Sequence, residues 1–218
     1  AFDATTGAVL PWNPNANNIV YALGLSGSTV YAGGAFTIIG SQTRNRIAAL
    51  DATLGTATAW DPNSNGTVTS LAVGGSMVYV GGSFTQVGGQ TRSRIAQLDA
   101  TGAATVWNPN ANNTVSAMAL DGSILYVAGY FTNVGGQTRD RIAAIDVPTG
   151  SATAWDPNSN SQIVAVAVQD SNVFVGGNFT NIGMQTRNRA AAFDATTGAV
   201  LPWNPNANNQ VTNIVVSG

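Results

Sequence analysis

The chain has no cysteine, histidine, lysine or glutamate among its 218 residues. Eight arginines and ten aspartates are its only charged side chains; they make up 8% of the residues, against roughly 25% in typical soluble domains. These absences exclude disulfides, thiol nucleophiles, cysteine or histidine zinc sites and histidine acid–base catalysis. A net charge of -2 gives no field that would gather nucleic acid, and no apolar run approaches the ~18 residues of a membrane helix. We therefore expect neither a nucleic-acid partner nor membrane insertion.

What the chain does contain is an internal repeat. Tryptophan recurs every 47 or 48 residues, and a Phe-Thr pair and a Gln-Thr-Arg-x-Arg segment follow the same period. The tryptophans are Trp12, Trp60, Trp107, Trp155 and Trp203. The Gln-Thr-Arg-x-Arg segments hold every arginine of the chain, namely Arg44, Arg46, Arg92, Arg94, Arg139, Arg141, Arg187 and Arg189. A period of this length indicates repeated supersecondary units that share a core with their neighbours.

Each unit is predicted to fold as four short strands separated by turns. In the first full unit these strands cover residues 19–25, 29–36, 47–51 and 56–60, and Pro62 then ends the pairing because it has no backbone N–H to donate. Four short strands in about 45 residues are typical of a propeller blade. The sequence therefore predicts an all-β fold, a β-propeller-type repeat of four-stranded antiparallel blades.

We expect a single repeat domain over residues 1–218, with four full units and a partial unit at each end. The units are 1–18 (partial), 19–66, 67–113, 114–161, 162–209 and 210–218 (partial). Residues 1–18 reappear unchanged as residues 192–209, and a ring closed by pairing the two ends would have one blade without its second strand. Two interpretations remain: a window cut from a longer repetitive polypeptide, or an open array whose ends meet a neighbouring copy.

Two repeat types resemble this unit. The run Asp-Ala-Thr-Leu-Gly at 51–55, Trp60, and Val-Tyr-Val-Gly-Gly at 78–82 resemble the kelch blade. The fuller pattern, Val-Tyr-Val-Gly-Gly-x-Phe-Thr followed by Gly-Gly-Gln-Thr-Arg-x-Arg-Ile-Ala, resembles more closely the delta-sixty type of repeat in large secreted bacterial proteins. The resemblance covers the whole chain and implies a propeller-like architecture. Together with the low charge and the Asn/Thr-rich turns, it favours an extracellular or cell-surface location.

Carboxylates are the main candidates for chemistry. Only Asp121, Asp140 and Asp170 lie outside the positions that the repeat shares, and nothing in the pattern forces two of them into one cleft, as glycoside hydrolysis requires. Asp61, Asn63 and Asn65 fit the opening of a calcium loop, D-x-N-x-N-G, but no glutamate follows and Asx turns account for the same residues. We expect no enzyme, no cofactor and no metal.

The recurring tryptophans admit two interpretations. They can stack on sugar rings, as in a carbohydrate-binding propeller with a glycan partner, or they can pack between blades with each indole N–H bonded to a neighbour. One bulky aromatic at the same strand position in every unit favours packing, and carbohydrate binding is the alternative.

The charges predict a polarised molecule. Loop topology places all eight arginines, with three aspartates, on one face of the disc and the other seven aspartates on the opposite face; the latter include Asp3, Asp51, Asp99, Asp146 and Asp194. These groups either satisfy nearby backbone and cross-blade partners, or they stack copies head to tail into a filament. The predicted function is a non-catalytic extracellular structural or adhesive module that self-associates; a lectin-like propeller is second and a propeller enzyme third.

Overall fold

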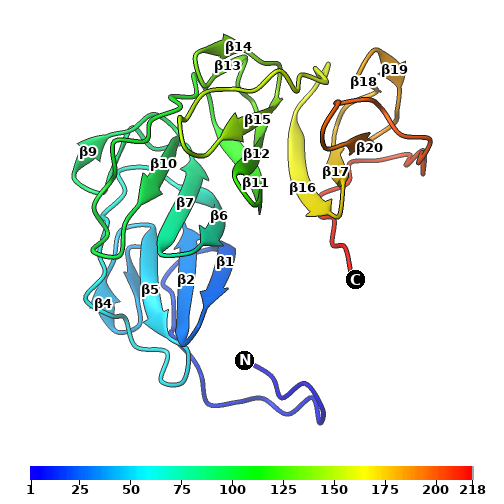
Figure 1. Ribbon diagram of the computed structural model, residues 1–218. Helices are drawn as coiled ribbons and strands as arrows, with labels where there is room; N and C mark the ends of the chain where they lie inside the picture. Colours follow the sequence, from blue (N-terminus) through cyan, green and yellow to red (C-terminus); the bar gives the residue numbers. More distant parts are fainter. Residues whose placement is uncertain (218) are drawn as a thin grey trace.

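The computed structural model describes residues 1–217, and these residues form strands, turns and loops without any helix. The described chain accordingly offers no helix that could cross a membrane. Four antiparallel sheets of three strands follow one another along the chain, and they stand around an open arc (Figure 1). Each sheet is one blade. The predicted all-β, propeller-type repeat fold is confirmed.

Within each blade the strands lie in chain order, and each pairs with the next. The inner strands are β1 (Val20–Ser26), β6 (Val68–Gly74), β11 (Val115–Asp121) and β16 (Ile163–Gln169). The middle strands are β2 (Thr29–Gly34), β7 (Met77–Gly82), β12 (Ile124–Gly129) and β17 (Asn172–Gly177). The third strands are β5 (Ile47–Asp51), β10 (Ile95–Leu98), β15 (Ile142–Asp146) and β20 (Ala190–Asp194).

The predicted fourth strand is shorter than the sequence indicated. In the first blade, only Ala57 of residues 56–60 forms a β-bridge, to Leu50 of β5. The Thr58 N–H still donates to Ala49, but the Thr58 carbonyl accepts from the Arg44 guanidinium instead of a strand. Because an arginine takes this carbonyl, the ladder ends after one bridge. The same bridge recurs at Ala104, Ala152 and Val200.

A small hairpin that the sequence did not predict lies between the second and third strands of every blade. In Figure 1 these hairpins stand at the outer rim of the arc. They are β3–β4 (Ile38–Ile39, Gln42–Thr43), β8–β9 (Gln86–Val87, Gln90–Thr91), β13–β14 (Asn133–Val134, Gln137–Thr138) and β18–β19 (Asn181–Ile182, Gln185–Thr186). The arginines follow directly after them.

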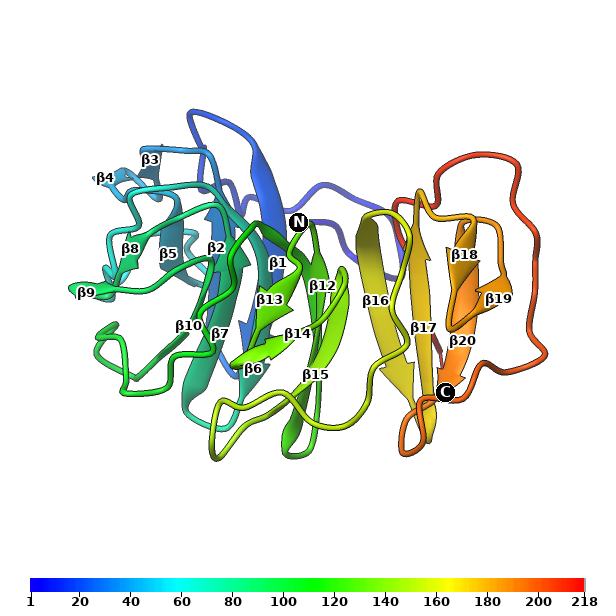
Figure 2. The same cartoon turned by 90° about the horizontal axis from the view of Figure 1, so that it is seen from above.

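The core lies between blades rather than inside one. One buried cluster joins Ile47 and Ala49 of blade 1 to Val68 and Phe84 of blade 2, and similar clusters join blades 2 to 3 and 3 to 4. Figure 2 shows the blades standing side by side. Glycine permits the close approach: a Cβ on Gly33 of β2 would lie 2.6 Å from Val68 of the next blade. Each blade therefore depends on its neighbour to stay dry.

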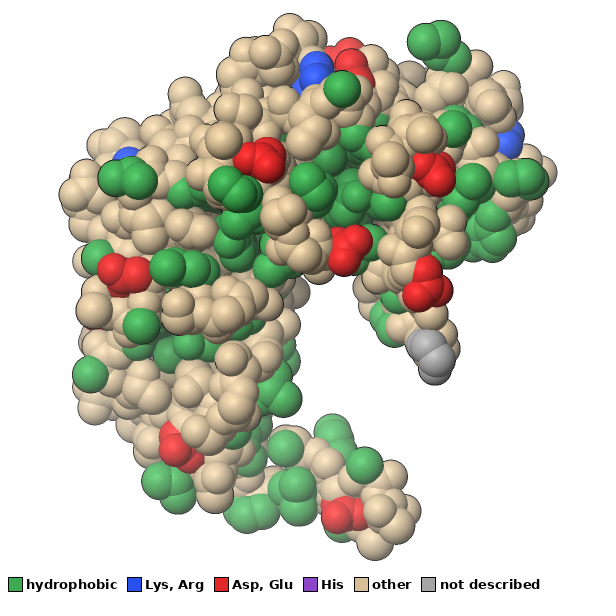
Figure 3. Space-filling model, in the orientation of Figure 1, with side chains coloured by type: hydrophobic (Ala, Val, Ile, Leu, Met, Phe, Trp, Pro, Cys, Tyr) green, Lys and Arg blue, Asp and Glu red, His purple; other side chains and the backbone are tan. Residues whose placement is uncertain are grey.

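The two ends of the arc carry short segments in place of whole blades. Residues 12–18 lie against blade 1, whereas the hairpin of residues 2–11 stands away from it in the opening of the arc (Figure 1). Residues 210–217 lie against blade 4 without forming a strand. Figure 3 shows the arc open between these segments, with hydrophobic side chains exposed on the N-terminal one. Together with blade 1, the N-terminal segment forms the smallest buried cluster, which holds five buried residues.

Candidate functional site

The three junctions between blades, and the outer side of blade 4, hold one aromatic pair each. A ring on the middle strand meets the next tryptophan edge to face, with ring centroids 5.1 to 5.4 Å apart. The pairs are Tyr31–Trp60, Tyr79–Trp107, Tyr126–Trp155 and Phe174–Trp203. Between complete blades, Trp60, Trp107 and Trp155 are only 4 to 7% exposed. Their indoles serve packing, and no face is free to stack on a sugar.

The indole N–H ties the tryptophan to the following blade. Trp60 donates to the Asp99 carbonyl at 3.1 Å, and Trp155 donates to the Asp194 carbonyl at 3.0 Å. Trp12 makes the same bond to Asp51 of blade 1 at 3.0 Å. Trp107 differs, because its buried N–H has no acceptor within hydrogen-bond distance among the described residues.

An asparagine clamp, absent from the sequence-based prediction, joins each linker to the next blade. The Asn65 side-chain oxygen accepts the Thr85 and Gln86 N–H groups, both at 2.9 Å, and its amide donates to the Thr85 hydroxyl. Asn17, Asn112 and Asn160 make the corresponding bonds. These asparagines recur with the same period as the Phe-Thr pairs, which could have indicated the clamp from the sequence. Asparagine in a loop, however, is usually interpreted as a turn residue.

The candidate calcium loop is part of this linker. Asp61 lies 3.8 Å from the Arg44 guanidinium, and the Asn63 side-chain oxygen accepts from Asn45. Asn65 already accepts two backbone bonds as the clamp. Within residues 1–217 no group of three or more carboxylates could hold a metal ion. All three candidate ligands therefore have structural contacts, and the loop offers no preformed cage.

The arginines make local bonds in every unit. The first arginine of each pair donates to a carbonyl on the short fourth strand, as Arg44 does to Thr58 at 2.7 Å; the others of this type are Arg92, Arg139 and Arg187. The second arginine of each pair has left-handed backbone geometry, with φ between 65° and 67°; these are Arg46, Arg94, Arg141 and Arg189. All eight are half-buried, so little guanidinium surface faces outward.

The aspartates of the opposite set cap the turns after the third strands. Each accepts backbone N–H bonds from the next few residues; they are Asp3, Asp51, Asp99, Asp146 and Asp194. The Thr101 hydroxyl, with backbone N–H groups, holds the pKa of Asp99 below its usual value, and backbone and hydroxyl donors of Thr197 do the same for Asp194. Outside these turns, Asp140 lies 3.6 Å from Arg141.

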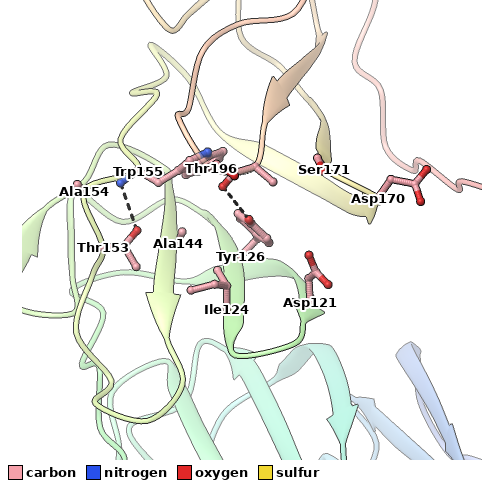
Figure 4. A pocket seen from close by; sticks show the side chains of 11 residues that line it. Asp121, Ile124, Tyr126, Ala144, Thr153, Ala154, Trp155, Asp170, Ser171 and Thr196 are labelled. Carbon is pink, nitrogen blue, oxygen red and sulfur yellow. Dashed lines mark hydrogen bonds between the residues drawn. The ribbon is translucent and has the colours of Figure 1, made fainter.

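A cleft of about 480 Å³ lies between blades 3 and 4 and brings Asp121 and Asp170 to its rim (Figure 4). Its floor is Trp155 and Tyr126, whose hydroxyl donates to the Ala195 carbonyl at 3.1 Å. Burial first, then the negative charges of Asp121 and Asp194, raise the pKa of Tyr126. In Figure 4 the Asp170 carboxylate points away from Asp121, so the two acids do not converge on a common point.

The most unusual surface is the side of blade 1 that faces residues 1–12. Leu23 and Leu25 of β1 are 62% and 68% exposed, whereas their counterparts on the other inner strands are half-buried or buried. Beside them is an apolar notch of about 510 Å³, lined by Ala1, Trp12, Leu23, Gly24, Leu25, Val30 and Ala52. We call this surface the open face. An exposed apolar patch of this kind marks an interaction surface.

Comparison with known proteins agrees with this geometry. Residues 75–104 and 120–143 match the family described as "Domain of unknown function (DUF5122) beta-propeller". The chain has a β-propeller fold. Two computationally designed proteins are similar in structure: Ika8, with a TM-score of 0.58 and 15% identity over 94% of this chain and 68% of Ika8, and Ika4, with 0.54 and 18% over 82% and 92%.

BamB from Moraxella catarrhalis is also similar, with a TM-score of 0.52 and 23% identity over 85% of this chain. The matched region is 50% of the BamB chain. At these identities the similarity shows the fold alone. A search of curated proteins found no sequence that matches the chain.

Proposed function

We propose that the protein is a non-catalytic structural repeat module that self-associates end to end through the open face of blade 1. The observation that carries this proposal is the exposure of Leu23 and Leu25, which occupy positions that a neighbouring blade covers elsewhere. Blades in this fold bury their apolar faces only against other blades, and an unpartnered blade face therefore favours association with another copy.

The same proposal places the protein outside the cell or on its surface, as a repeat of the delta-sixty type. The quoted repeat pattern and the low charge support this location. The buried tryptophans give no support to a lectin, and the diverging carboxylates of Asp121 and Asp170 give none to a hydrolase.

End-to-end association differs from the alternative in which arginine and aspartate faces stack. Association through leucines persists or strengthens with salt, because apolar burial is not screened, whereas charge stacking weakens within a few hundred millimolar. The half-buried arginines, which already donate to carbonyls, favour the apolar route.

Sedimentation velocity over a hundredfold range of protein concentration, at low and high salt, tests the proposal. We expect a mass that rises with concentration, that high salt does not reduce, and that Leu25→Glu abolishes. Met184→Glu is the matched control, because Met184 is 98% exposed on a rim hairpin away from the open face. A monomer at every concentration, or an association that salt dissolves and Leu25→Glu leaves intact, would overturn the proposal.

A further inference from the structure

The open face and the far end of the arc hold copies of one segment. Residues 1–12 and 192–203 are identical in sequence, and they have the same local geometry. In both, the aspartate carbonyl accepts from the glycine four residues later, and the phenylalanine forms a β-bridge to the valine seven residues later. The ends of the first copy, Ala1 and Trp12, contact blade 1, while residues 192–203 belong to blade 4. Either segment therefore has the side chains and the shape to occupy the place on blade 1.

We propose that two copies join by exchange of this segment: residues 192–203 of one copy replace residues 1–12 of the next, and blade 4 of the first packs on blade 1 of the second. This inference rests on the proposed self-association and names its joint. The occupant of the open face is thus blade 4 of a second copy.

The notch in the open face has the form of an unfilled aromatic site. At every complete junction a Tyr of the middle strand stands against the tryptophan, but Trp12 has no such partner among the described residues. Phe174 pairs across the sheet with Ala192, and Ala192 corresponds to Ala1. Because Ala1 and Trp12 both line the notch, a blade that carries Phe174 beside Ala192 would place its ring there.

Blade 4 offers the matching surface. Phe174 and Trp203 already form the edge-to-face pair, and Trp203 is 43% exposed because no other blade formed by residues 1–217 covers it. After exchange, the Trp203 indole N–H takes over the bond that Trp12 makes to the Asp51 carbonyl. The new joint would reproduce the contact that joins blades 3 and 4.

Residues 210–217 hold the place of the incoming strand on blade 4. Val211 and Ile214 lie over Gly176, as Val68 and Leu71 of blade 2 lie over Gly33. This segment forms no strand, and its hydrogen bonds to blade 4 are one from the Val211 N–H and one from the Gln169 amide to the Ser217 carbonyl. Because only these two hydrogen bonds hold residues 210–217 to blade 4, the inner strand of a second copy can displace them.

The exchange needs little rearrangement beyond these two segments. Residues 13–18 remain on their own blade, where Asn17 clamps Thr37 and Ile38. The contact is heterologous, since one copy gives blade 4 and the other gives blade 1, so it propagates into a ring or a filament. Swapped contacts are equivalent to those they replace, and the net gain is the burial of Leu23, Leu25 and the notch.

Two tryptophans with identical neighbours in sequence provide the test. Trp12→Ala weakens the segment that must leave, so we expect the concentration at half-association to fall about tenfold, the factor for about 1.4 kcal/mol. Trp203→Ala removes the incoming indole, so that concentration should rise at least about tenfold. Sedimentation velocity measures both, far-UV circular dichroism melting checks that each variant is folded, and Phe174→Ala is a second donor variant.

Mixing the variants tests the polarity of the joint. A Leu25→Glu copy keeps an intact blade 4, but its open face cannot bind blade 4 of another copy. A Trp203→Ala copy keeps an intact open face, but its own blade 4 binds another copy poorly. At a concentration between the half-association values of the wild type and of Trp203→Ala, each variant alone should be monomeric, and the mixture should form a 1:1 dimer that grows no further.

Three outcomes would decide against segment exchange alone, and a fourth would decide against association itself. Equal effects of Trp12→Ala and Trp203→Ala, or a mixture that stays monomeric, would overturn the exchange while end-to-end association stands. The exchange would also be overturned if residues 1–12 stayed bound to blade 1 when the wild type associates. The measurement is the rate of proteolysis before Trp12, which would then not change on association. A wild-type protein that remains monomeric throughout would overturn the proposed function and the exchange together.

Discussion

Residues 1–18 and 192–209 have one sequence in two surroundings. Phe193 is completely buried between blade 4 strands and Trp155, whereas Phe2, its counterpart, is 71% exposed. Yet both segments form the same turn, with a glycine N–H to aspartate carbonyl bond of 2.9 to 3.0 Å. The sequence of the segment thus determines the local turn, whereas the burial of its side chains depends on the strand that lies beside it.

Other residues of the two segments show the reverse difference. Trp12 and Asn17 of the first segment find their partners on blade 1, whereas Trp203 and Asn208 of the second have no complete blade beyond them. Each segment therefore satisfies the half of a junction that the other leaves open. This reciprocity is why the sequence identity matters for assembly.

The largest difference between the two segments is expected when each phenylalanine is replaced by alanine. Phe193→Ala leaves a cavity in a closed core and should lower the free energy of unfolding by about 3–5 kcal/mol. Phe2→Ala removes a side chain that is mostly in water, and should change it by less than about 0.5 kcal/mol. Urea denaturation at a protein concentration where the chain is monomeric measures both. Equal losses would mean that the two environments are the same.

Replacing the clamp asparagines should lower the free energy of unfolding by less, and here the residue of the first segment should matter more than its counterpart in the second. Asn17→Ala removes two backbone acceptor bonds and one bond to the Thr37 hydroxyl, and we expect a loss of about 1–2 kcal/mol. Asn208, its counterpart, makes no side-chain hydrogen bond within residues 1–217, so Asn208→Ala should be neutral. Thermal melting of the two variants beside the wild type is sufficient, and a loss in Asn208→Ala would contradict the assignment.

The smallest effect concerns pH at the junction of blades 3 and 4. Because the pKa of Tyr126 is raised above its usual value of 10.0, the unfolded chain ionises this phenol first. The stabilisation is full below about pH 10 and is lost as the pH rises through the folded-state pKa. Tyr126→Phe should therefore show a shallower fall in melting temperature between pH 9 and 11, at a cost at pH 7 of about 1 kcal/mol or less.

Phe174 supplies a natural control, because it holds the corresponding position without a hydroxyl. An alkaline profile of Tyr126→Phe that coincides with the wild type would show that Tyr126 does not contribute to the loss of stability at high pH.

Periodicity was sufficient to predict the blades from sequence. The inner and third strands were placed within one residue, because alternating apolar residues and turn signals recur in register. The length of the fourth strand was overestimated. The Thr-Ala-Thr-Ala pattern of residues 56–59 is typical of a strand, but the Thr58 carbonyl accepts a hydrogen bond from Arg44, 14 residues earlier in the chain. The two-residue rim hairpins are too short to leave a periodic signal.

The functional surface could be predicted only in part. The packing of the tryptophans followed from their spacing, and the structure confirms it for Trp60, Trp107 and Trp155. The open face could not be predicted from the sequence, because residues 1–18 and 192–209 are identical in sequence and differ only in their surroundings in the fold. The polarised charges remain a prediction, with each arginine now known to have a nearby carbonyl or carboxylate.

The arrangement of the core between blades has a mechanical consequence. When the chain is pulled from both termini, the joints are loaded in series, and the terminal segments leave before the blades. Residues 210–217 are held to blade 4 by two hydrogen bonds, and Trp12 and Ala16 pack against the smallest buried cluster. Blade 1 is then the least supported sheet and should unravel next. Each blade releases 47 or 48 residues, so a force trace should show a sawtooth with steps of about 165 Å.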